Sequence, residues 1–198
     1  MSKLMRLHAS SKVMFAVALV LTLVATNSAR ASDSDAWEAL RDGRAVLMLR
    51  HALAPGTGDP DNFDLEDCST QRNLNEQGRE QARAWKPFLR KQGIQQARVF
   101  SSQWCRCKET AREMAMGEVT EWPALNSFFA NRGEGSIATR QTIALVNDLD
   151  EGTPVILVSH QVNITRLTGV YPASNEGVII ALPLSRNPVV LARVSPGD

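Results

Sequence analysis

The sequence predicts a three-layer α/β/α sandwich built around a mainly parallel sheet. Short, continuously apolar segments of strand length recur along the chain, and segments with helical periodicity lie between them. The composition fits one ordinary globular domain, because 198 residues with 43% hydrophobic side chains can bury a single core. Three cysteines are too few for a fold that depends on disulfides. We therefore expect one domain, without internal repeats, over residues 32–198.

Five apolar segments have the length of strands, at residues 45–49, 99–101, 155–159, 178–182 and 189–194. Their apolar residues are continuous rather than alternating. This pattern is typical of strands that are buried on both faces of a parallel sheet.

Helical periodicity predicts four helices between these strands, over residues 75–91, 104–116, 136–148 and 162–169. Asn73 or Asn75 is expected to cap the first helix, and Gly93 lies just past its end. Ser136 is expected to cap the third. Two long irregular segments remain, residues 53–72 and 122–135, and both are expected near strand ends. Loops of this length in a compact domain usually carry function.

The first 31 residues form a separate segment with the three parts of a secretory signal peptide. It begins with three basic residues, Lys3, Arg6 and Lys12. An apolar run follows over residues 13–25, and Ala-Arg-Ala at residues 29–31 has the small-x-small pattern of a cleavage site. The run is shorter than the roughly 17–25 residues that a membrane anchor needs, so export with cleavage after Ala31 is favoured over anchoring. The mature domain would then be periplasmic or secreted.

Cleavage would also change the charge of the protein. The segment carries four of the 22 basic side chains and none of the 21 acidic ones, so the net charge would fall from +1 to −3. Nucleic acid is not expected as a partner, because its recognition needs a concentrated basic surface. No other apolar run is long enough to span a membrane, and none is expected in the mature chain.

The two histidines of the predicted domain each follow an apolar strand. His51 follows the first strand through Arg50, and His160 follows the strand at residues 155–159. In open α/β sheets, ligands bind outside the carboxyl ends of the strands. A third strand end leads to Arg106, at the start of the next helix. Two guanidinium groups, two imidazoles and a helix N-terminus at one sheet edge predict an anion site suited to a phosphoryl group.

These motifs resemble those of the histidine phosphatase superfamily, which includes phosphoglycerate mutases and acid phosphatases. The matching pieces are, in chain order, Leu49-Arg50-His51, Ser101-Ser102-x-x-x-Arg106 and Val158-Ser159-His160. Residues 72–78 resemble the start of the family's first helix. Residues 67–74 and 160–164 are similar to a small exported bacterial branch. The resemblance covers about residues 45–169 and implies a phosphoglycerate mutase-like fold and a phosphatase that needs neither metal nor cofactor.

The resemblance also implies roles for individual residues. His51 would attack phosphorus and form a phosphohistidine that water later hydrolyses. Arg50, Arg106 and His160 would bind the phosphoryl oxygens. The substrate would be a phosphomonoester or phosphoanhydride, either a phosphorylated small molecule or a phosphate of the cell envelope. Export disfavours a glycolytic mutase.

The sequence departs from the family pattern at the acid that protonates the leaving group. Gln161 follows His160 where one part of the family has an acid, and residues 125–127 read Leu-Asn-Ser near the other usual place. Glu134, between two glycines, is the first candidate for this acid, and Asp67 and Glu109 are further candidates.

A second departure concerns the residue after the Arg-His pair. Ala52 stands where the family usually has glycine, in a place where the backbone lies close to the phosphate. Together with the missing acid, this substitution motivates an alternative function, a phosphate-binding domain without catalytic turnover.

Three cysteines in a chain expected to meet an oxidant predict one disulfide and one free thiol. Cys105 and Cys107 are too close in sequence for an unstrained bridge between them, so Cys68 is expected to pair with one of the two. Cys107 is the preferred partner, because Cys105 could equally point into the core as a small apolar residue. Three buried thiols are the alternative.

Overall fold

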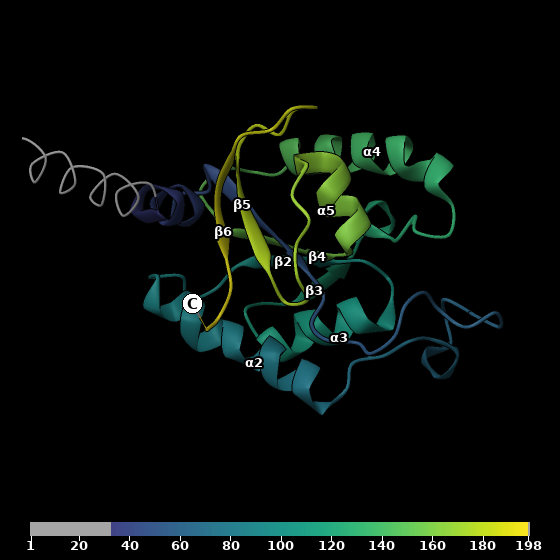
Figure 1. The fold of residues 1–198 in the computed structure, drawn as a ribbon. Helices are drawn as coiled ribbons and strands as arrows, with labels where there is room; N and C mark the ends of the chain where they lie inside the picture. Colours follow the sequence, from purple (N-terminus) through teal and green to yellow (C-terminus); the bar gives the residue numbers. More distant parts are fainter. Residues whose placement is uncertain (1–32, 198) are drawn as a thin grey trace, which may run out of the picture.

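The structure is a computed structural model that describes residues 33–197 of the chain (Figure 1). The predicted signal peptide over residues 1–31, its cleavage after Ala31 and residue 32 lie outside the described residues. Strands and helices alternate along most of the described chain, as the sequence predicts. In this part of the chain no helix is both long and apolar enough to cross a membrane.

A six-stranded sheet forms the centre of the molecule. Its strands are β1 (Ala45–Arg50), β2 (Arg98–Ser101), β3 (Val119–Glu121), β4 (Val155–Ser159), β5 (Gly177–Ala181) and β6 (Val190–Val194). Their spatial order is β3-β2-β4-β1-β5-β6. The first four in this order pair in parallel, whereas β5 runs antiparallel to β1 and β6. The predicted mainly parallel sheet is therefore confirmed.

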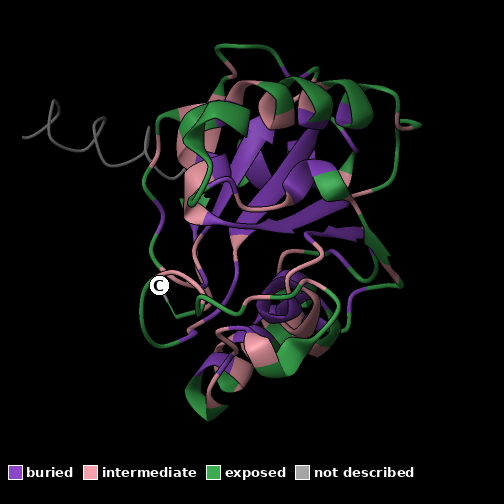
Figure 2. Ribbon diagram, turned by 90° about the vertical axis from the view of Figure 1, so that its right-hand side faces the viewer, coloured by how far each residue is buried: buried purple, intermediate pink, exposed green. Residues whose placement is uncertain are grey.

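Helices cover both faces of the sheet, which confirms the three-layer sandwich (Figure 1). They are α2 (Glu76–Lys91), α3 (Cys105–Met114), α4 (Gly135–Asn147) and α5 (Gln161–Thr168), with a further helix over residues 33–41. On β1, Leu47 and Leu49 pack in one core with α2, α3 and the helix at residues 33–41. Val46 and Met48 face the opposite core, which α4 and α5 cover. Figure 2 shows the buried sheet between helices whose outer faces are exposed.

The start of α2 is fixed by two contacts with the segment that follows His51. Of the two predicted caps, Asn75 is the one observed, and its side chain accepts a 2.8 Å hydrogen bond from the backbone N–H of Gly78. A Cβ at Gly78 would lie 2.1 Å from the carbonyl oxygen of Leu53, so only glycine permits this approach. The helix is thereby packed directly against the chain leaving β1.

Two expectations about individual elements are wrong, and two elements were not predicted. Ser136 does not cap α4, because the helix already begins at Gly135, after a 3₁₀ turn, and the Ser136 hydroxyl instead accepts a hydrogen bond from Arg166. Strand β6 is not buried on both faces, because it is the edge strand and leaves Arg193 exposed. Strand β3 and the helix at residues 33–41 are absent from the prediction. Strand β3 has only three residues and two of them are exposed, so no apolar run marks it.

Candidate active site

Neighbouring parallel strands bring the two histidines together. Strands β1 and β4 are paired so that Arg50 lies opposite Ser159, and the residues that follow are His51 and His160. Their ring centroids are 5.5 Å apart, and the backbone N–H of His51 donates to the carbonyl oxygen of Ser159 at 3.0 Å. Ser102, which follows the end of β2, places its Oγ 2.9 Å from Nε2 of His160. The predicted convergence at one sheet edge is therefore present.

The hydrogen bonds of His51 assign its tautomer. Nδ1 lies 2.8 Å from the carbonyl oxygen of Ala52, which can only accept, so Nδ1 carries the proton. Nε2 lies 3.2 Å from Nε of Arg106, a guanidinium nitrogen that can only donate. The lone pair of Nε2 therefore faces the guanidinium group.

Burial keeps both imidazoles neutral. His51 is 3% exposed and His160 is 4% exposed. Burial and the charge of Arg106 hold the pKa of each well below the ordinary value of 6.5. At neutral pH both rings are uncharged, which is the state a nucleophilic nitrogen needs.

Three guanidinium groups surround the imidazoles, one more than the sequence predicted. Arg106 lies in the first turn of α3 and is 3% exposed. Arg50 donates from Nη1 to the carbonyl oxygen of Pro172 at 3.1 Å, while its Nε is buried without a hydrogen-bond partner among the described residues. Arg72 donates to the carbonyl oxygens of Gly58 and Ala54 from the long loop after His51. The Arg72-Asn73 pair at the start of the family-like helix motif was the signal that could have identified Arg72.

Asp59, a residue that the sequence analysis did not identify, forms an ion pair with Arg106. Asp59 accepts from Nη1 of Arg106 at 2.6 Å and from Nη2 at 3.2 Å, and its Oδ2 also accepts from Nε1 of Trp104 at 3.0 Å. Burial opposes its ionisation, but hydrogen bonds and charge from Arg106 outweigh burial and lower the pKa of Asp59 below its ordinary value. Asp59 is therefore an ionised side chain within the anion site.

These groups line a cavity of about 630 Å³. Both long irregular segments contribute to it, the first through residues 56–61, Phe63 and Arg72, the second through residues 127 and 129–131. Two of the exposed large apolar side chains of the described chain, Phe129 and Tyr171, also line it. The expectation that these loops lie near the strand ends is confirmed.

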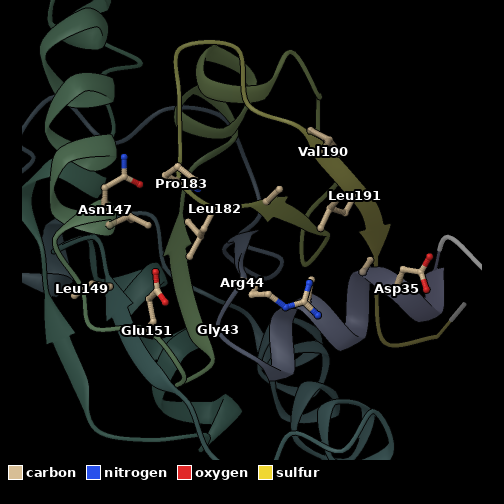
Figure 3. A pocket seen from close by; sticks show the side chains of 14 residues that line it. Asp35, Gly43, Arg44, Asn147, Leu149, Glu151, Leu182, Pro183, Val190 and Leu191 are labelled. Atoms are coloured by element: carbon tan, nitrogen blue, oxygen red, sulfur yellow. The ribbon is translucent and has the colours of Figure 1, made fainter.

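A larger hollow of about 830 Å³ lies at the opposite end of β1 (Figure 3). Gly43, Arg44, Asn147 and Leu182 are among its lining residues. It contains neither histidine and only one arginine, so its larger volume does not make it a candidate for phosphate chemistry. The cavity at His51 contains both histidines and three arginines, which suit phosphate chemistry, and is the candidate active site.

The carboxylates considered from the sequence do not line this cavity. Glu134 is exposed at the end of a 3₁₀ turn, where its carboxylate accepts from Nδ2 of Asn131 at 2.7 Å. Asp67 accepts from the backbone N–H of Ser69. Glu109 pairs with Arg79 at 3.2 Å on the helix surface. The predicted role of Glu134 stays a prediction, and Asp59 is the carboxylate that pairs with Arg106 of the site.

The predicted disulfide is present, but its preferred partner was wrong. Cys68 is bonded to Cys105, with their Cα atoms 5.7 Å apart, and Cys107 is a buried free thiol. Two helical residues point about 200° apart around the axis, so Cys105 faces the loop while Cys107 faces the core. There the Sγ of Cys107 lies 3.5 Å from Nε2 of His160, and burial raises its pKa to about 12.

We expect the bridge to contribute to both stability and site order. It joins the loop that carries Asp59 to the helix that carries Arg106, and its sequence separation is 37 residues. The Cys68→Ser/Cys105→Ser double variant should lose up to roughly 4 kcal/mol of unfolding free energy on the chain-entropy model. Denaturant unfolding measures this loss. Peptide mapping without reductant should give a Cys68–Cys105 peptide, and a bridge to Cys107 in the native protein would contradict the assignment.

Within residues 33–197, no group of three or more His, Cys, Asp or Glu side chains is placed to hold a metal ion. The cationic character of the site comes instead from its arginines. This arrangement suits an anion more than a cation.

Residues 46–144 match the sequence profile described as histidine phosphatase superfamily (branch 1). The chain belongs to the histidine phosphatase superfamily. It is accordingly a phosphatase by family and a hydrolase by reaction class. The matched residues include Arg50, His51 and Arg106 of the site, and His160 follows beyond them. Among curated proteins, none matches this chain by sequence.

Solved structures show the histidine phosphatase fold in several similar proteins. The protein histidine phosphatase SixA complexed with tungstate is 20% identical, with a TM-score of 0.56 over 77% of this chain and 97% of that chain. A putative phosphohistidine phosphatase SixA from Agrobacterium tumefaciens is 18% identical, with a TM-score of 0.53 over 78% and 98%. Phosphoserine phosphatase from Entamoeba histolytica, in complex with 3-phosphoglyceric acid, is 15% identical, with a TM-score of 0.54 over 76% and 96%. At these identities the likeness concerns the fold alone.

Proposed function

We propose that this protein is an exported phosphatase that hydrolyses a phosphomonoester or phosphoanhydride through a phosphohistidine at His51, without a metal ion. The observation that carries the proposal is the state of His51. Its ring is neutral, its Nδ1 proton is held by Ala52, and its Nε2 lone pair faces Arg106 at the edge of the cavity. A nucleophile in this state needs no further base before it attacks.

The surrounding side chains would bind the group that is transferred. Arg50, Arg106 and His160 are proposed to contact the phosphoryl oxygens, and Arg72 adds a third guanidinium to the same cavity. Guanidinium groups bind phosphate oxygens in two-pronged fashion and stabilise the negative charge of the transition state. The hydrogen bond between Ser102 and Nε2 of His160 would hold the second imidazole in a fixed orientation.

The size of the cavity supports a substrate with an organic group. About 630 Å³ is far more than one phosphoryl group occupies, and Phe129 and Tyr171 supply apolar surface beyond the arginines. Tungstate and 3-phosphoglyceric acid in structurally similar proteins support an oxyanion ligand at this fold. We propose a phosphorylated small molecule or a phosphate of the cell envelope as the substrate.

Two features support export. Residues 1–31 have the pattern of a signal peptide. The Cys68–Cys105 bridge belongs to the class of structural disulfides that persist in oxidising compartments. Cell fractionation with N-terminal sequencing of the mature protein tests this part, and a cytoplasmic protein that retains residue 1 would contradict it.

The catalytic part is tested by following phosphate release and protein phosphorylation together. The purified protein is incubated with a panel of phosphomonoesters and phosphoanhydrides, and the reaction is quenched with alkali, in which phosphohistidine survives. We expect phosphate release with at least one substrate, and alkali-stable phosphorylation of the peptide that contains His51. Phosphate binding without release or phosphorylation would instead establish the phosphate-binding domain without turnover.

A further inference from the structure

Asp59 occupies a position that a phosphoryl group would need. Its two carboxylate oxygens accept from both terminal nitrogens of Arg106, at 2.6 and 3.2 Å. The third nitrogen of the same guanidinium donates to Nε2 of His51 at 3.2 Å. A two-pronged carboxylate on a buried arginine, beside the lone pair of a neutral histidine, is an internal anion placed where a substrate anion would bind.

The surroundings of Asp59 are strongly cationic. Two further hydrogen bonds hold Asp59 in the site. The backbone N–H of Arg72 donates to Oδ1 of Asp59 at 3.2 Å, and Nε1 of Trp104 donates to Oδ2 of Asp59. The side chain is 17% exposed, so it contacts both the arginine and the open space of the cavity. The ionisable groups that share the cavity with it are Arg50, His51, Asp61, Arg72, Arg106, His160 and Tyr171.

A bound phosphoryl group would change the balance of charge at Asp59. A dianion that takes the donors of Arg106 displaces the carboxylate from them and stands next to it. Two anions at a few ångströms repel, which favours uptake of a proton, and the guanidinium groups hold the phosphoryl oxygens in their charged form. Asp59, displaced from the Arg106 contacts that lower its pKa, is the group that takes up the proton. The same event that fills the site would therefore convert Asp59 from an acceptor into a proton donor.

We propose that Asp59 is the catalytic acid that protonates the leaving group, and that substrate binding displaces it from Arg106 and loads it with its proton. This inference rests on the proposed phosphohistidine mechanism. It fills the place left by Gln161 and by residues 125–127, where the sequence carries no acid.

The two half-reactions balance with this assignment. Nε2 of His51 forms a bond to phosphorus while the bond from phosphorus to the leaving oxygen breaks, and the proton of Asp59 passes to that oxygen. The alcohol departs and Asp59 is again a carboxylate. It then accepts a proton from the water that attacks phosphorus, the bond from phosphorus to His51 breaks, and inorganic phosphate leaves with His51 neutral and Asp59 protonated. Return of Asp59 to Arg106 releases that proton and closes the cycle.

The other acidic candidates lack these contacts. Glu134 is exposed and bonded to Asn131, and Asp67 is bonded to the backbone of Ser69. Neither lines the cavity. Both serve as comparison positions, because the same carboxylate-to-amide change can be made at each.

The decisive measurement is the dependence of kcat/KM on the leaving group. This parameter reports the steps up to departure of the alcohol, so hydrolysis of the phosphohistidine does not affect it. For Asp59→Asn we expect kcat/KM with an alkyl phosphate such as glycerol 2-phosphate to fall by about 10²–10³-fold. With p-nitrophenyl phosphate, whose leaving group needs no proton, we expect less than a tenfold fall. Equal losses with both esters, or no loss with either, would overturn the assignment.

The control variants separate this role from general effects of the loop. Asp67→Asn keeps the acceptor that caps the turn at Cys68, and should leave kcat/KM within about twofold for both esters. Glu134→Gln tests the acid that the sequence suggested. A selective loss with the alkyl ester in Glu134→Gln, and none in Asp59→Asn, would transfer the role to Glu134. If the parent protein hydrolyses neither ester and forms no phosphohistidine with any substrate, the proposed function itself fails.

A binding measurement tests the loading of the proton without catalysis. Sulfate remains a dianion near neutral pH, so any proton taken up when it binds is taken up by the protein. Calorimetric titration in buffers of different ionisation enthalpy should show uptake of about one proton per sulfate in the parent. Asp59→Asn should remove this uptake and bind sulfate at least about tenfold more tightly, since the competing anion is gone. Uptake that persists in Asp59→Asn would belong to another group and would overturn the proposal.

Discussion

Replacement of His51 by alanine is expected to abolish phosphate release. The variant loses the neutral Nε2 whose lone pair faces Arg106, and His160 is held by Ser102 in a different position. Removal of a nucleophile that acts with its neighbours as one unit costs several orders of magnitude, so we expect a fall of at least about 10⁴-fold in kcat. A phosphate-release assay with the best substrate of the panel measures it.

Loss of activity in His51→Ala must be separated from loss of fold. His51 is buried, but its side chain makes two hydrogen bonds among residues 33–197, so the circular dichroism spectrum should match that of the parent. Alkali-stable phosphorylation of the protein should be lost in the variant. Activity within tenfold of the parent would remove His51 from the nucleophilic role.

Arg106→Ala is expected to reduce activity by about 10² or more, and Arg106→Lys by clearly less. Alanine removes a preorganised donor to the transition state, whereas lysine keeps the charge and loses the two-pronged geometry. Steady-state kinetics of both variants with one substrate gives the comparison. Mild and equal losses would show that Arg106 has no special contact with the phosphoryl group.

A matched arginine on the same face of the fold serves as the control. Arg83 on α2 is exposed and pairs with Glu76 and Glu113. Surface ion pairs contribute little, so Arg83→Ala should keep kcat and KM within about twofold. Because Arg106→Ala also leaves Asp59 without its partner, the double variant with Asp59→Asn shows whether an unpaired carboxylate adds to the effect.

The local sequence predicts most of the sheet because strand burial leaves an apolar run in the chain. The segments at β1, β2 and β4 are uninterrupted, and each ends in the residues that form the site. Strand β3 leaves no such trace, because an exposed three-residue edge needs no apolar side chains. The helix at residues 33–41 directly follows the predicted signal peptide.

The residues of the site also fall into those that the sequence predicts and those that it does not. His51, His160, Arg50 and Arg106 stand at fixed offsets from strands or a helix, so topology alone brings them to one edge. Asp59 has no such anchor, because it lies in an irregular loop whose path is set by tertiary contacts with Arg72, Trp104 and Arg106. The partner of Cys68 depends on which way two nearby helical residues point. Spacing in the sequence cannot decide that until the face of α3 that meets the core is known.

The buried thiol of Cys107 has a consequence for how the protein keeps its covalent connectivity. Disulfide exchange requires a thiolate, and burial raises the pKa of Cys107 to about 12, so the thiol stays protonated at neutral pH. Cys107 lies on the same helix as Cys105 and is the free thiol that could exchange with the Cys68–Cys105 disulfide. In the folded protein its thiol is buried and protonated, so it cannot act as the nucleophile. In the folded protein, burial of the Cys107 thiol therefore protects the Cys68–Cys105 pairing against exchange.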